Sequence, residues 1–396
     1  MGKREAELTE VLSGFDVVLC HYWNHPLLAS FLGQGGLPYT RILFWCHNSG
    51  LEEPHVLPDY LLGSGASVLF TTPVSVDAHN IRSRLELNPK AFDIVPSVRA
   101  LNQYLEIGDE RVTRQPLSGL LYVGTVSPTK MHPDSARIFA SLGRKGFNID
   151  VVGGDQEHVL EAEVRSIGGK LTVHGWVDGV LDFYGRSQIF VYPLREGHYG
   201  SGEQVILEAM AAGLPVVVFN NPAERVIVSH GETGFIAKTA EEFIAYVIKL
   251  AQDKELYALM SKQGIARVKE KFDSVAMAKT LLNKIDAQLT RPKVKIHRQV
   301  PSGCADIGLY LFSIHSFFES SQEPEVTLDN EVDVEILFRR IIRYLDSPEK
   351  RGAWISKTKG SPFHYQQFFP ESPGLMALCG LICDYIRRTQ KLSATP

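Results

Sequence analysis

Residues 192–218 hold the largest group of glycines and polar side chains that could bind a phosphate. The segment is typical of an apolar strand, a glycine-rich turn, a helix and a second strand. Ser201 followed by Gln204 ahead of an apolar run predicts a capping box, so a helix of about three turns should begin near Gly202. The free N–H groups of a helix start bind anions, and glycines let a ligand approach the backbone. An ordinary α/β connection, whose glycines only shape a turn, explains this stretch equally well.

A second glycine-containing loop begins at Gly124, directly after an apolar run at 120–123, and ends at Lys130. A lysine in this position can act as a point charge on a phosphate. The sequence Gly153-Gly154-Asp155 lacks the third glycine of the dinucleotide fingerprint. We therefore expect phosphate binding without a nicotinamide cofactor.

Two histidines, His21 and His47, follow the expected strands 15–20 and 41–46. Ligands of parallel α/β sheets bind at the carboxyl ends of the strands, where an imidazole could contact a substrate. A structural, hydrogen-bonded histidine is nevertheless the more common case, by roughly two to one. Both interpretations stay open at this point.

The composition indicates a globular chain without a polyanion-binding character. Its 396 residues suffice for roughly two or three domains. The net charge of −4 argues against a nucleic-acid partner. The first residues are charged, no apolar run reaches transmembrane length, and the five cysteines are odd in number and scattered. We expect a cytoplasmic protein, with peripheral contact to a membrane left open.

Apolar strands without clean alternation are separated by helical stretches, which predicts an α/β fold with parallel sheets covered on both faces. A polar break at 108–116 and a basic linker at 288–302 suggest three parts. The expected parts are a reduced N-terminal Rossmann-like domain (1–110), a C-terminal Rossmann-like domain (116–287) and a mostly helical appendage (303–396).

The run Glu208-Ala209-Met210-Ala211-Ala212-Gly213-Leu214-Pro215-Val216-Val217, with Glu196-Gly197 ahead of it, resembles a family signature. The family is the retaining GT-B glycosyltransferases of the family-4 type, the glycosyl transferases group 1. The resemblance covers roughly residues 15–285 and is strongest at 124–236. It implies a GT-B-like fold, with two Rossmann-like domains whose parallel sheets face a cleft and a donor held mainly by the second.

The resemblance also implies a role for each candidate residue. Glu208 would bind the ribose of a nucleotide-diphosphate sugar, and Lys130 its diphosphate. Glu196 would contact the sugar, and His47 would face the reacting centre; these two form the catalytic set. The loops that hold Gly124, Gly200, Ser201 and Gly202 would complete the donor-binding set.

The chain departs from the family pattern at three positions. The family spacing places a glutamate at Gly200, so that the use of Glu196 requires a four-residue insertion. Thr125 and Thr129 stand where the family usually has an arginine. Arg195 or Lys238 could supply the missing positive charge.

The function expected from the resemblance is glycosyl transfer from a nucleotide-diphosphate sugar to an acceptor hydroxyl, with retention of configuration. The sequence has no Asp-x-Asp triplet, and we expect no metal or other cofactor. The acceptor could be a glycan, a lipid or a protein. A non-catalytic nucleotide-sugar-binding or partner subunit is the main alternative, and a nucleotide-sugar epimerase is a weaker one.

The N-terminal domain has only about four candidate strands, which is small for a Rossmann-like half. We therefore expect the sheet edge beside residues 15–20 to be covered by the appendage, by a partner subunit or by self-association. For the same reason we expect the isolated chain to bind nucleotide and to turn over slowly.

Overall fold

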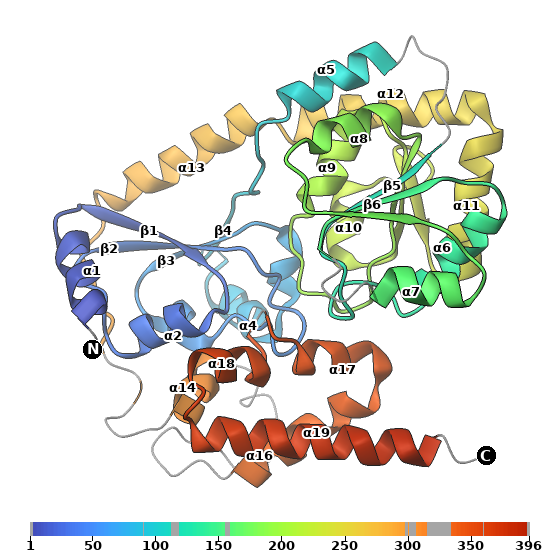
Figure 1. The fold of residues 1–396 in the computed structure, drawn as a ribbon. Coiled ribbons are helices and arrows are strands. Elements are labelled where there is room, and N and C mark those ends of the chain that lie inside the picture. The colour runs from blue at the N-terminus through green and yellow to red at the C-terminus, as the bar shows by residue number, and fades with distance from the viewer. Residues whose placement is uncertain are drawn as a thin grey trace. The chain divides into compact units, whose positions relative to one another are not determined.

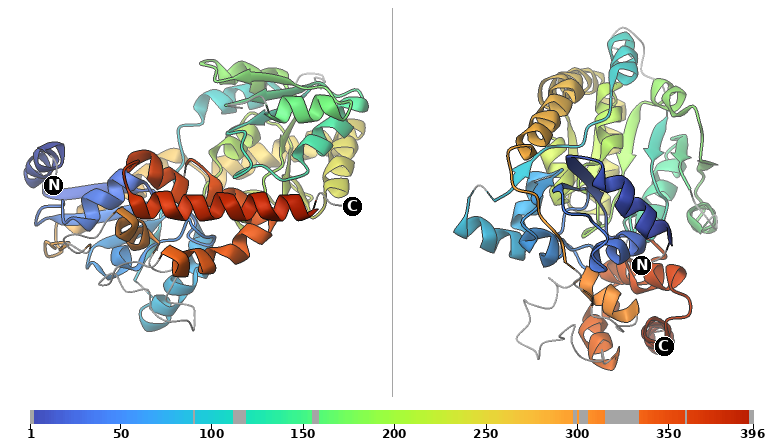
Figure 2. Two further views of the ribbon diagram at one scale, coloured as in Figure 1. Left: turned by 60° about the horizontal axis from the view of Figure 1, so that its bottom comes forward. Right: turned by 90° about the vertical axis from the view of Figure 1, so that its left-hand side faces the viewer.

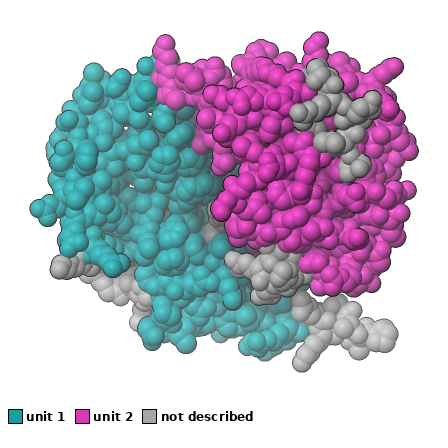
Figure 3. Space-filling model, turned by 45° about the horizontal axis from the view of Figure 1, so that its top comes forward, with its two compact units in different colours: residues 1–95, 199–201, 280–396 teal, residues 96–198, 202–279 magenta. Residues whose placement is uncertain are grey.

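The computed structural model describes residues 3–89, 91–111, 119–154, 159–297, 300, 306–314, 334–358 and 360–393. Asp155, most of the expected break at 108–116 and part of the expected linker at 288–302 lie outside these residues. The chain divides into two compact units, shown in two colours in Figure 3. Unit 1 comprises Met1–Val95, Tyr199–Ser201 and Thr280–Pro396, and unit 2 comprises Pro96–His198 and Gly202–Lys279. The predicted boundaries 1–110, 116–287 and 303–396 stay predictions.

Unit 1 contains a parallel sheet of four strands in the order β1-β2-β3-β4 (Figure 1). Its strands are β1 (Val17–Tyr22), β2 (Arg41–Cys46), β3 (Ser67–Phe70) and β4 (Asp93–Ile94). Strand β1 lies at the sheet edge, next to β2, with Val17 paired to Arg41. The predicted number of strands in this part is therefore confirmed.

Both faces of this sheet are covered, because its strands carry apolar side chains in both directions. On one face Phe44 and Phe70 pack in a cluster with Phe31 of helix α2 (Pro26–Gly33). On the other face Trp45 packs with Leu281 of helix α13 (Ser274–Gln288). Shorter helices complete the unit: α1 (Lys3–Ser13), α3 (Asp59–Gly63), the 3₁₀ helix η1 (Pro73–Asp77) and α4 (His79–Leu87).

The described part of the appendage is helical, as predicted, and it shares a core with the first sheet's helices. Its elements are α14 (Asp306–Ser313), α16 (Val334–Asp346), α17 (Pro348–Ile355), α18 (Pro362–Phe368) and α19 (Pro373–Ser393). Tyr310, Trp354 and Tyr365 are fully buried in a cluster that includes Ala29 of α2. Helices α14 and α18 pack on α2, and α16 packs along α19. Figure 2 shows α19 as one long helix, in red.

Unit 2 contains a parallel sheet of six strands in the order β10-β9-β8-β5-β6-β7. The strands are β5 (Leu120–Val123), β6 (Ile149–Val152), β7 (Thr172–Gly175), β8 (Ile189–Tyr192), β9 (Val216–Phe219) and β10 (Gly234–Ala237). The change of direction in strand order lies beside β5 and β8, so the loops after these two strands are neighbours. Ligands of doubly wound sheets bind at such a point.

Eight helices described in unit 2 surround this sheet, and a single apolar cluster connects them to it. They are α5 (Asn102–Arg111), α6 (Ser135–Arg144), α7 (Val159–Ser166), α8 (Val180–Arg186), α9 (Gln204–Ala211), α10 (Pro222–Ile227), α11 (Ala240–Gln252) and α12 (Lys254–Lys271). The described chain thus has two parallel sheets in an α/β fold, which confirms the predicted fold class. None of the helices among the described residues combines the length and apolar content that crossing a bilayer requires.

Helix α9 differs from its prediction at the start. It begins at Gln204 rather than near Gly202, and its eight residues make about two turns rather than three. Glu203 is its N-cap residue, and no side chain caps the helix there. The predicted capping box between Ser201 and Gln204 is therefore wrong.

Both side chains of the predicted capping box have other partners. The Ser201 hydroxyl donates to the carbonyl oxygen of His47, at 2.8 Å, within unit 1. The Gln204 side-chain amide donates to the carbonyl of Ser97 and accepts from the backbone N–H of Arg99. Contacts between residues far apart in sequence have replaced the local contact that the pattern predicted.

Candidate functional site

The loop after β5 is shaped by close contact with the loop after β6. Gly124 has a φ of +150°, and its N–H donates to the carbonyl of Val152. Gly153 has a φ of +139°, and a Cβ added there would lie 1.9 Å from the carbonyl oxygen of Gly124. Gly153 is therefore required by the close packing of the two strand ends, and Gly124 by its positive φ.

Lys130 ends the loop after β5 and lies against the loop after β8. The backbone N–H of Arg195 donates to the carbonyl of Lys130, at 3.0 Å. The Lys130 ammonium lies 3.1 Å from Oε2 of Glu203, the N-cap residue of α9. The fold thus brings Lys130 to the start of α9, where the sequence predicted a phosphate site.

Glu203 is 5% exposed and has several partners within unit 2. The phenol of Tyr192 donates to the same Oε2 atom that Lys130 contacts, at 2.7 Å. Nδ1 of His198 lies 3.7 Å from the other carboxylate oxygen. Burial would raise the pKa of Glu203, but the charges of Lys130 and His198 and the Tyr192 hydrogen bond hold it below its ordinary value. Glu203 is therefore a carboxylate with a stable negative charge at this site.

His198 is buried between Glu203 and a second carboxylate. Its Nε2 lies 3.1 Å from both oxygens of Glu224, whose side chain is fully buried. Asn221 donates to Glu224 at 2.8 Å and fixes its orientation. Burial would lower the pKa of His198, but the charge and hydrogen bond of Glu224, with Glu203 in addition, raise it above its ordinary value. The two carboxylates thus favour protonation of the imidazole.

Arg195 places a second positive charge beside the Lys130 loop. It is only 2% exposed, and its guanidinium donates to the carbonyl of Pro128 at 2.8 Å and to that of Glu196 at 3.4 Å. Arg195 was one of the residues expected to replace the arginine that this loop lacks. Its position beside the loop supports that role.

Glu208 lies one turn after Gln204 on α9 and is 2% exposed. One carboxylate oxygen accepts a hydrogen bond from the phenol of Tyr184, at 2.8 Å. The other lies 2.9 Å from the guanidinium of Arg99, which is mostly exposed. A ribose that binds Glu208 would therefore share the carboxylate with Tyr184 and replace or join Arg99.

The catalytic candidate Glu196 and the remaining donor-binding candidates are divided between the units. Glu196 and Gly202 belong to unit 2, and the Glu196 side chain is exposed. Gly200 and Ser201 belong to unit 1, where Ser201 also hydrogen-bonds Thr71 at 2.8 Å. Within unit 2 the fold therefore groups Gly124, Lys130 and the start of α9, whereas Glu208 faces Arg99 and Tyr184.

His47 lies at the end of β2 in unit 1, within a cluster of aromatic rings. Its Nε2 lies 2.8 Å from Nδ1 of His21, so that one imidazole donates to the other. The ring stacks on Trp23 with a centroid distance of 5.5 Å and packs beside Trp45. Burial, with a smaller contribution from the His21 charge, lowers the pKa of His47 to about 4. His47 is therefore neutral at physiological pH.

Sequence reasoning missed Glu203, His198 and Glu224. Each is charged or titratable, yet each is at most 6% exposed, and their partners come from three different loops and helices. The only sequence signal was that Glu203 stands between the glycine turn and the apolar run, where a helix start was already expected. Their mutual pairing could not be seen because it depends on the packing of β5, β8 and α10.

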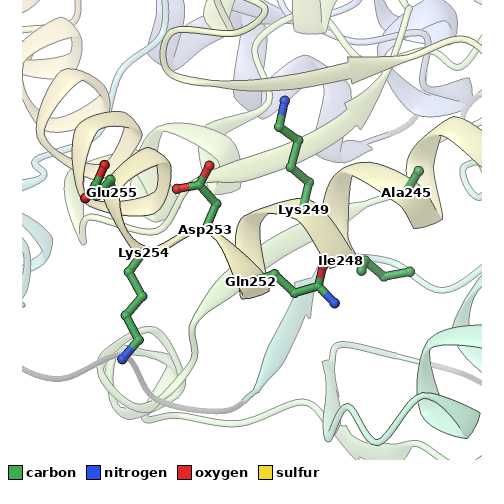
Figure 4. Close-up of a pocket in the computed structure, with 7 residues that line it drawn as sticks. All are labelled: Ala245, Ile248, Lys249, Gln252, Asp253, Lys254 and Glu255. Carbon is green, nitrogen blue, oxygen red and sulfur yellow. The ribbon is translucent and has the colours of Figure 1, made fainter.

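A surface hollow elsewhere in unit 2 does not involve the predicted site. It lies between α11 and α12 and is lined by Ala245, Ile248, Lys249, Gln252, Asp253, Lys254 and Glu255 (Figure 4). None of these was a candidate site residue. Across the described ranges, no three His, Cys, Asp or Glu side chains are grouped as a metal site would require.

The family model of the glycosyl transferases group 1 matches residues 118–253, which include the Lys130 loop and helix α9. In these residues the chain resembles the glycosyl transferases group 1. Two curated relatives illustrate the similarity. The capsular polysaccharide biosynthesis glycosyltransferase CapM of Staphylococcus aureus is 28% identical over 161 residues, and the match covers 39% of this chain and 42% of CapM. The putative glycosyltransferase YtcC of Bacillus subtilis is 24% identical over 80% of this chain and 82% of YtcC.

Solved structures of glycosyltransferases share the fold of this chain. Anabaena HepE, solved in complex with UDP-glucose, matches with a TM-score of 0.57 and 16% identity over 72% of this chain and 82% of HepE. A glycosyltransferase from Rickettsia africae matches with a TM-score of 0.55 and 14% identity over 73% of this chain and 81% of that one. The two parallel sheets described above are thus those of the GT-B fold.

Proposed function

We propose that this chain transfers a glycosyl group from a nucleotide-diphosphate sugar to an acceptor hydroxyl, with retention of configuration and without a metal. The family match over residues 118–253 supports the use of a nucleotide-sugar donor. The observation that carries the proposal is the position of the Lys130 ammonium at the start of α9, beside the neighbouring ends of β5 and β8. The acceptor class, whether glycan, lipid or protein, would be set by unit 1.

The diphosphate would be bound by Lys130 together with the backbone N–H groups at the start of α9. The Lys130 ammonium and the N-terminal end of the helix dipole are both positive, and Arg195 lies beside the loop that holds Lys130. Charge grows on a diphosphate as it leaves the sugar, and preorganised positive groups lower the barrier by stabilising that charge. Glycines 124 and 202 would allow the phosphates to approach the backbone.

The other candidates would position the rest of the donor. Glu208 would accept hydrogen bonds from the ribose hydroxyls, and Glu196 would contact the sugar. His47, held neutral by its surroundings, could donate one hydrogen bond to a sugar hydroxyl without adding a charge. These three assignments rest on the resemblance to the family signature.

The direct test is a thermal-shift screen of nucleoside diphosphates and their sugars, followed by calorimetry on the variant Lys130→Ala. A ligand present at a hundred times its Kd stabilises the folded state by about 2.7 kcal/mol, which the screen detects. Lys130→Ala should weaken diphosphate binding at least tenfold more than nucleoside binding. Lys145→Ala, an exposed lysine in the same unit, is the control. Equal losses for the diphosphate and the nucleoside would remove Lys130 from the phosphate site.

A non-catalytic nucleotide-sugar-binding subunit is the second candidate function. Two observations favour it: Lys130 is already paired with a buried carboxylate, and the first sheet has only four strands in the part of the chain that the structure describes. On this view the purified chain would bind donor but transfer sugar slowly, and a partner would complete the sheet beside β1. Efficient transfer by a monomeric preparation without a partner would exclude it. A changed sugar configuration in the absence of acceptor would reveal an epimerase instead.

We propose the cytoplasm as the place of this reaction. The described cysteines Cys20, Cys46, Cys379 and Cys383 are free thiols, as is usual in a reducing compartment. Fractionation of cells that express a tagged chain would test this and would show whether part of it associates with membranes.

A further inference from the structure

A network of four charged side chains is buried behind the proposed diphosphate site, and only one of them has been given a role. Lys130 pairs with Glu203 at 3.1 Å, and His198 pairs with Glu224 at 3.1 Å. The two pairs are connected, because Nδ1 of His198 lies 3.7 Å from Glu203. With His198 protonated, the two positive and two negative charges cancel.

A donor diphosphate would disturb this balance. Its negative charges would approach the Lys130 ammonium and with it the carboxylate of Glu203, which is buried and cannot be screened by water. Tyr192 keeps the Glu203 carboxylate in place by donating to the oxygen that Lys130 contacts. Glu203 therefore needs another positive partner once Lys130 turns to the phosphates. His198 is already next to it.

We propose that His198 is a positioning residue of the diphosphate site, which becomes the counter-ion of Glu203 when the donor takes Lys130, and which takes up a proton as it does so. The proton comes from the solvent and stays on the imidazole, and no bond of the donor is made or broken in this step. The inference rests on the proposed binding of the donor at Lys130. It predicts that donor binding and proton uptake are coupled.

The direction in which donor binding changes the pKa of His198 follows from the groups that face its imidazole. Glu203 at the start of α9 and Glu224 on α10 favour the protonated imidazole, whereas Lys130 from the loop after β5 disfavours it. Neutralisation of Lys130 by a diphosphate removes the opposing charge and adds negative charge nearby. The pKa of His198, already raised in the free protein, therefore rises further in the complex. Donor affinity should fall as the pH increases through this interval.

The experiment is calorimetric titration of the full chain with UDP-glucose, or with the nucleotide-diphosphate sugar that the thermal screen selects. Both phosphates of such a ligand are esterified, so any proton exchanged between about pH 6 and about pH 9 belongs to the protein. Each titration is repeated in two buffers with different ionisation enthalpies. We expect uptake of a fraction of one proton, and an affinity that drops roughly tenfold for each unit of pKa increase.

The variant His198→Gln cannot be protonated and should remove both the proton uptake and the pH dependence. His174→Gln is the matched control, because His174 also pairs with a carboxylate in unit 2, that of Asp150 at 2.6 Å. It should keep the wild-type proton uptake. Should His198→Gln fail to fold, Glu224→Gln serves instead, since it lowers the pKa of His198 and should move the uptake to lower pH.

The outcomes separate this inference from the proposed function. Donor binding by the wild-type chain without proton exchange would overturn the role of His198 alone. The same holds if His198→Gln keeps the proton uptake. Failure of every nucleotide-diphosphate sugar to bind the wild-type chain would overturn the proposed function, and this inference with it.

Discussion

The imidazole of His47 is kept neutral by its burial and by the neighbouring His21. A histidine whose pKa is lowered in the folded state favours folding less as the pH decreases. Above the unfolded pKa of about 6.5, His47 is neutral in both the folded and the unfolded state, so it does not reduce the free energy of unfolding. As the pH falls from that value to the folded pKa of about 4, the unfolded state binds a proton that the folded state does not, and stability is lost. Unit 1 should therefore lose stability within this acidic interval.

Replacement of His21 by asparagine should raise the pKa of His47, because the charge of His21 contributes to lowering it. The increase should be partial, since burial is the larger cause. Titration of the histidine side chains by NMR measures this directly. A His47 titration midpoint that stays near 4 in His21→Asn would show that burial alone sets it.

Glu208→Gln should preserve the fold and weaken binding of nucleoside diphosphates. An ionised acceptor for a pair of ribose hydroxyls loses about 1 kcal/mol or more when it becomes neutral, which is at least a fivefold loss of affinity. The variant also weakens the ion pair with Arg99, so the thermal midpoint should be measured beside the affinity. Unchanged affinity in calorimetry would remove Glu208 from the ribose site.

At the scale of the secondary-structure elements, the close packing of the ends of strands β5 and β6 depends on Gly153. Gly153→Ala places a methyl group against the carbonyl of Gly124 at a distance that no real contact shows, and in an unfavourable backbone conformation. We expect a loss of about 3 kcal/mol in the free energy of unfolding, because both strand ends must move. Urea denaturation of the full chain, monitored by far-UV circular dichroism, measures the effect.

Gly185→Ala is the matched control for this substitution. Gly185 lies in α8, and an added Cβ would meet nothing within 4 Å. Alanine is also the better helix former, so stability should be unchanged or slightly higher. Equal losses in the two variants would show that the packing of the loops after β5 and β6 is not the reason for the glycine.

The strands of both sheets could be predicted because each is a short, almost wholly apolar run bounded by polar or glycine residues. Strands β2 and β5 have the bounds that the sequence indicated. The start of α9 could not be predicted, because Ser201 gives its hydrogen bond to the distant His47. Local patterns describe a helix start correctly only when no tertiary partner competes for the capping side chain.

The candidate site was predicted in part for the same reason. Lys130 and the glycine turn were recognised because each stands next to an obvious strand, and the fold places Lys130 at the start of α9. The pairing of Glu203 with His198 depends on how their loop packs on Lys130 and Glu224, which are far away in sequence, so no local pattern predicted it. Arg99 was missed for this reason too, although it contacts Glu208 directly.

At the scale of the whole molecule, the appendage is attached to the first sheet by a buried hydrogen bond. The phenol of Tyr365 on α18 donates to the side chain of Asn24, which follows β1, at 3.0 Å. Tyr365→Phe removes the donor and leaves a buried amide oxygen without it. We expect unit 1 to lose about 1 to 3 kcal/mol in its free energy of unfolding.

Tryptophan fluorescence reports this change selectively, because Trp23, Trp45 and Trp354 belong to unit 1 and the single tryptophan of unit 2, Trp176, is 84% exposed. The fluorescence midpoint in urea should decrease in Tyr365→Phe, while nucleotide affinity stays at the wild-type level. A decrease in nucleotide affinity of similar size would show that the appendage also stabilises unit 2.

The discontinuity of unit 1 affects how the protein is made on the ribosome. Strands β1 to β4 and helix α2 emerge early, but helix α13, which covers the other face of their sheet, belongs to the last third of the chain. Unit 2 ends at Lys279 and can acquire its core while one apolar face of the first sheet is still exposed. The nascent chain therefore carries an aggregation-prone N-terminal segment for most of its synthesis, and its yield in cells should depend on chaperones more strongly than its final stability suggests.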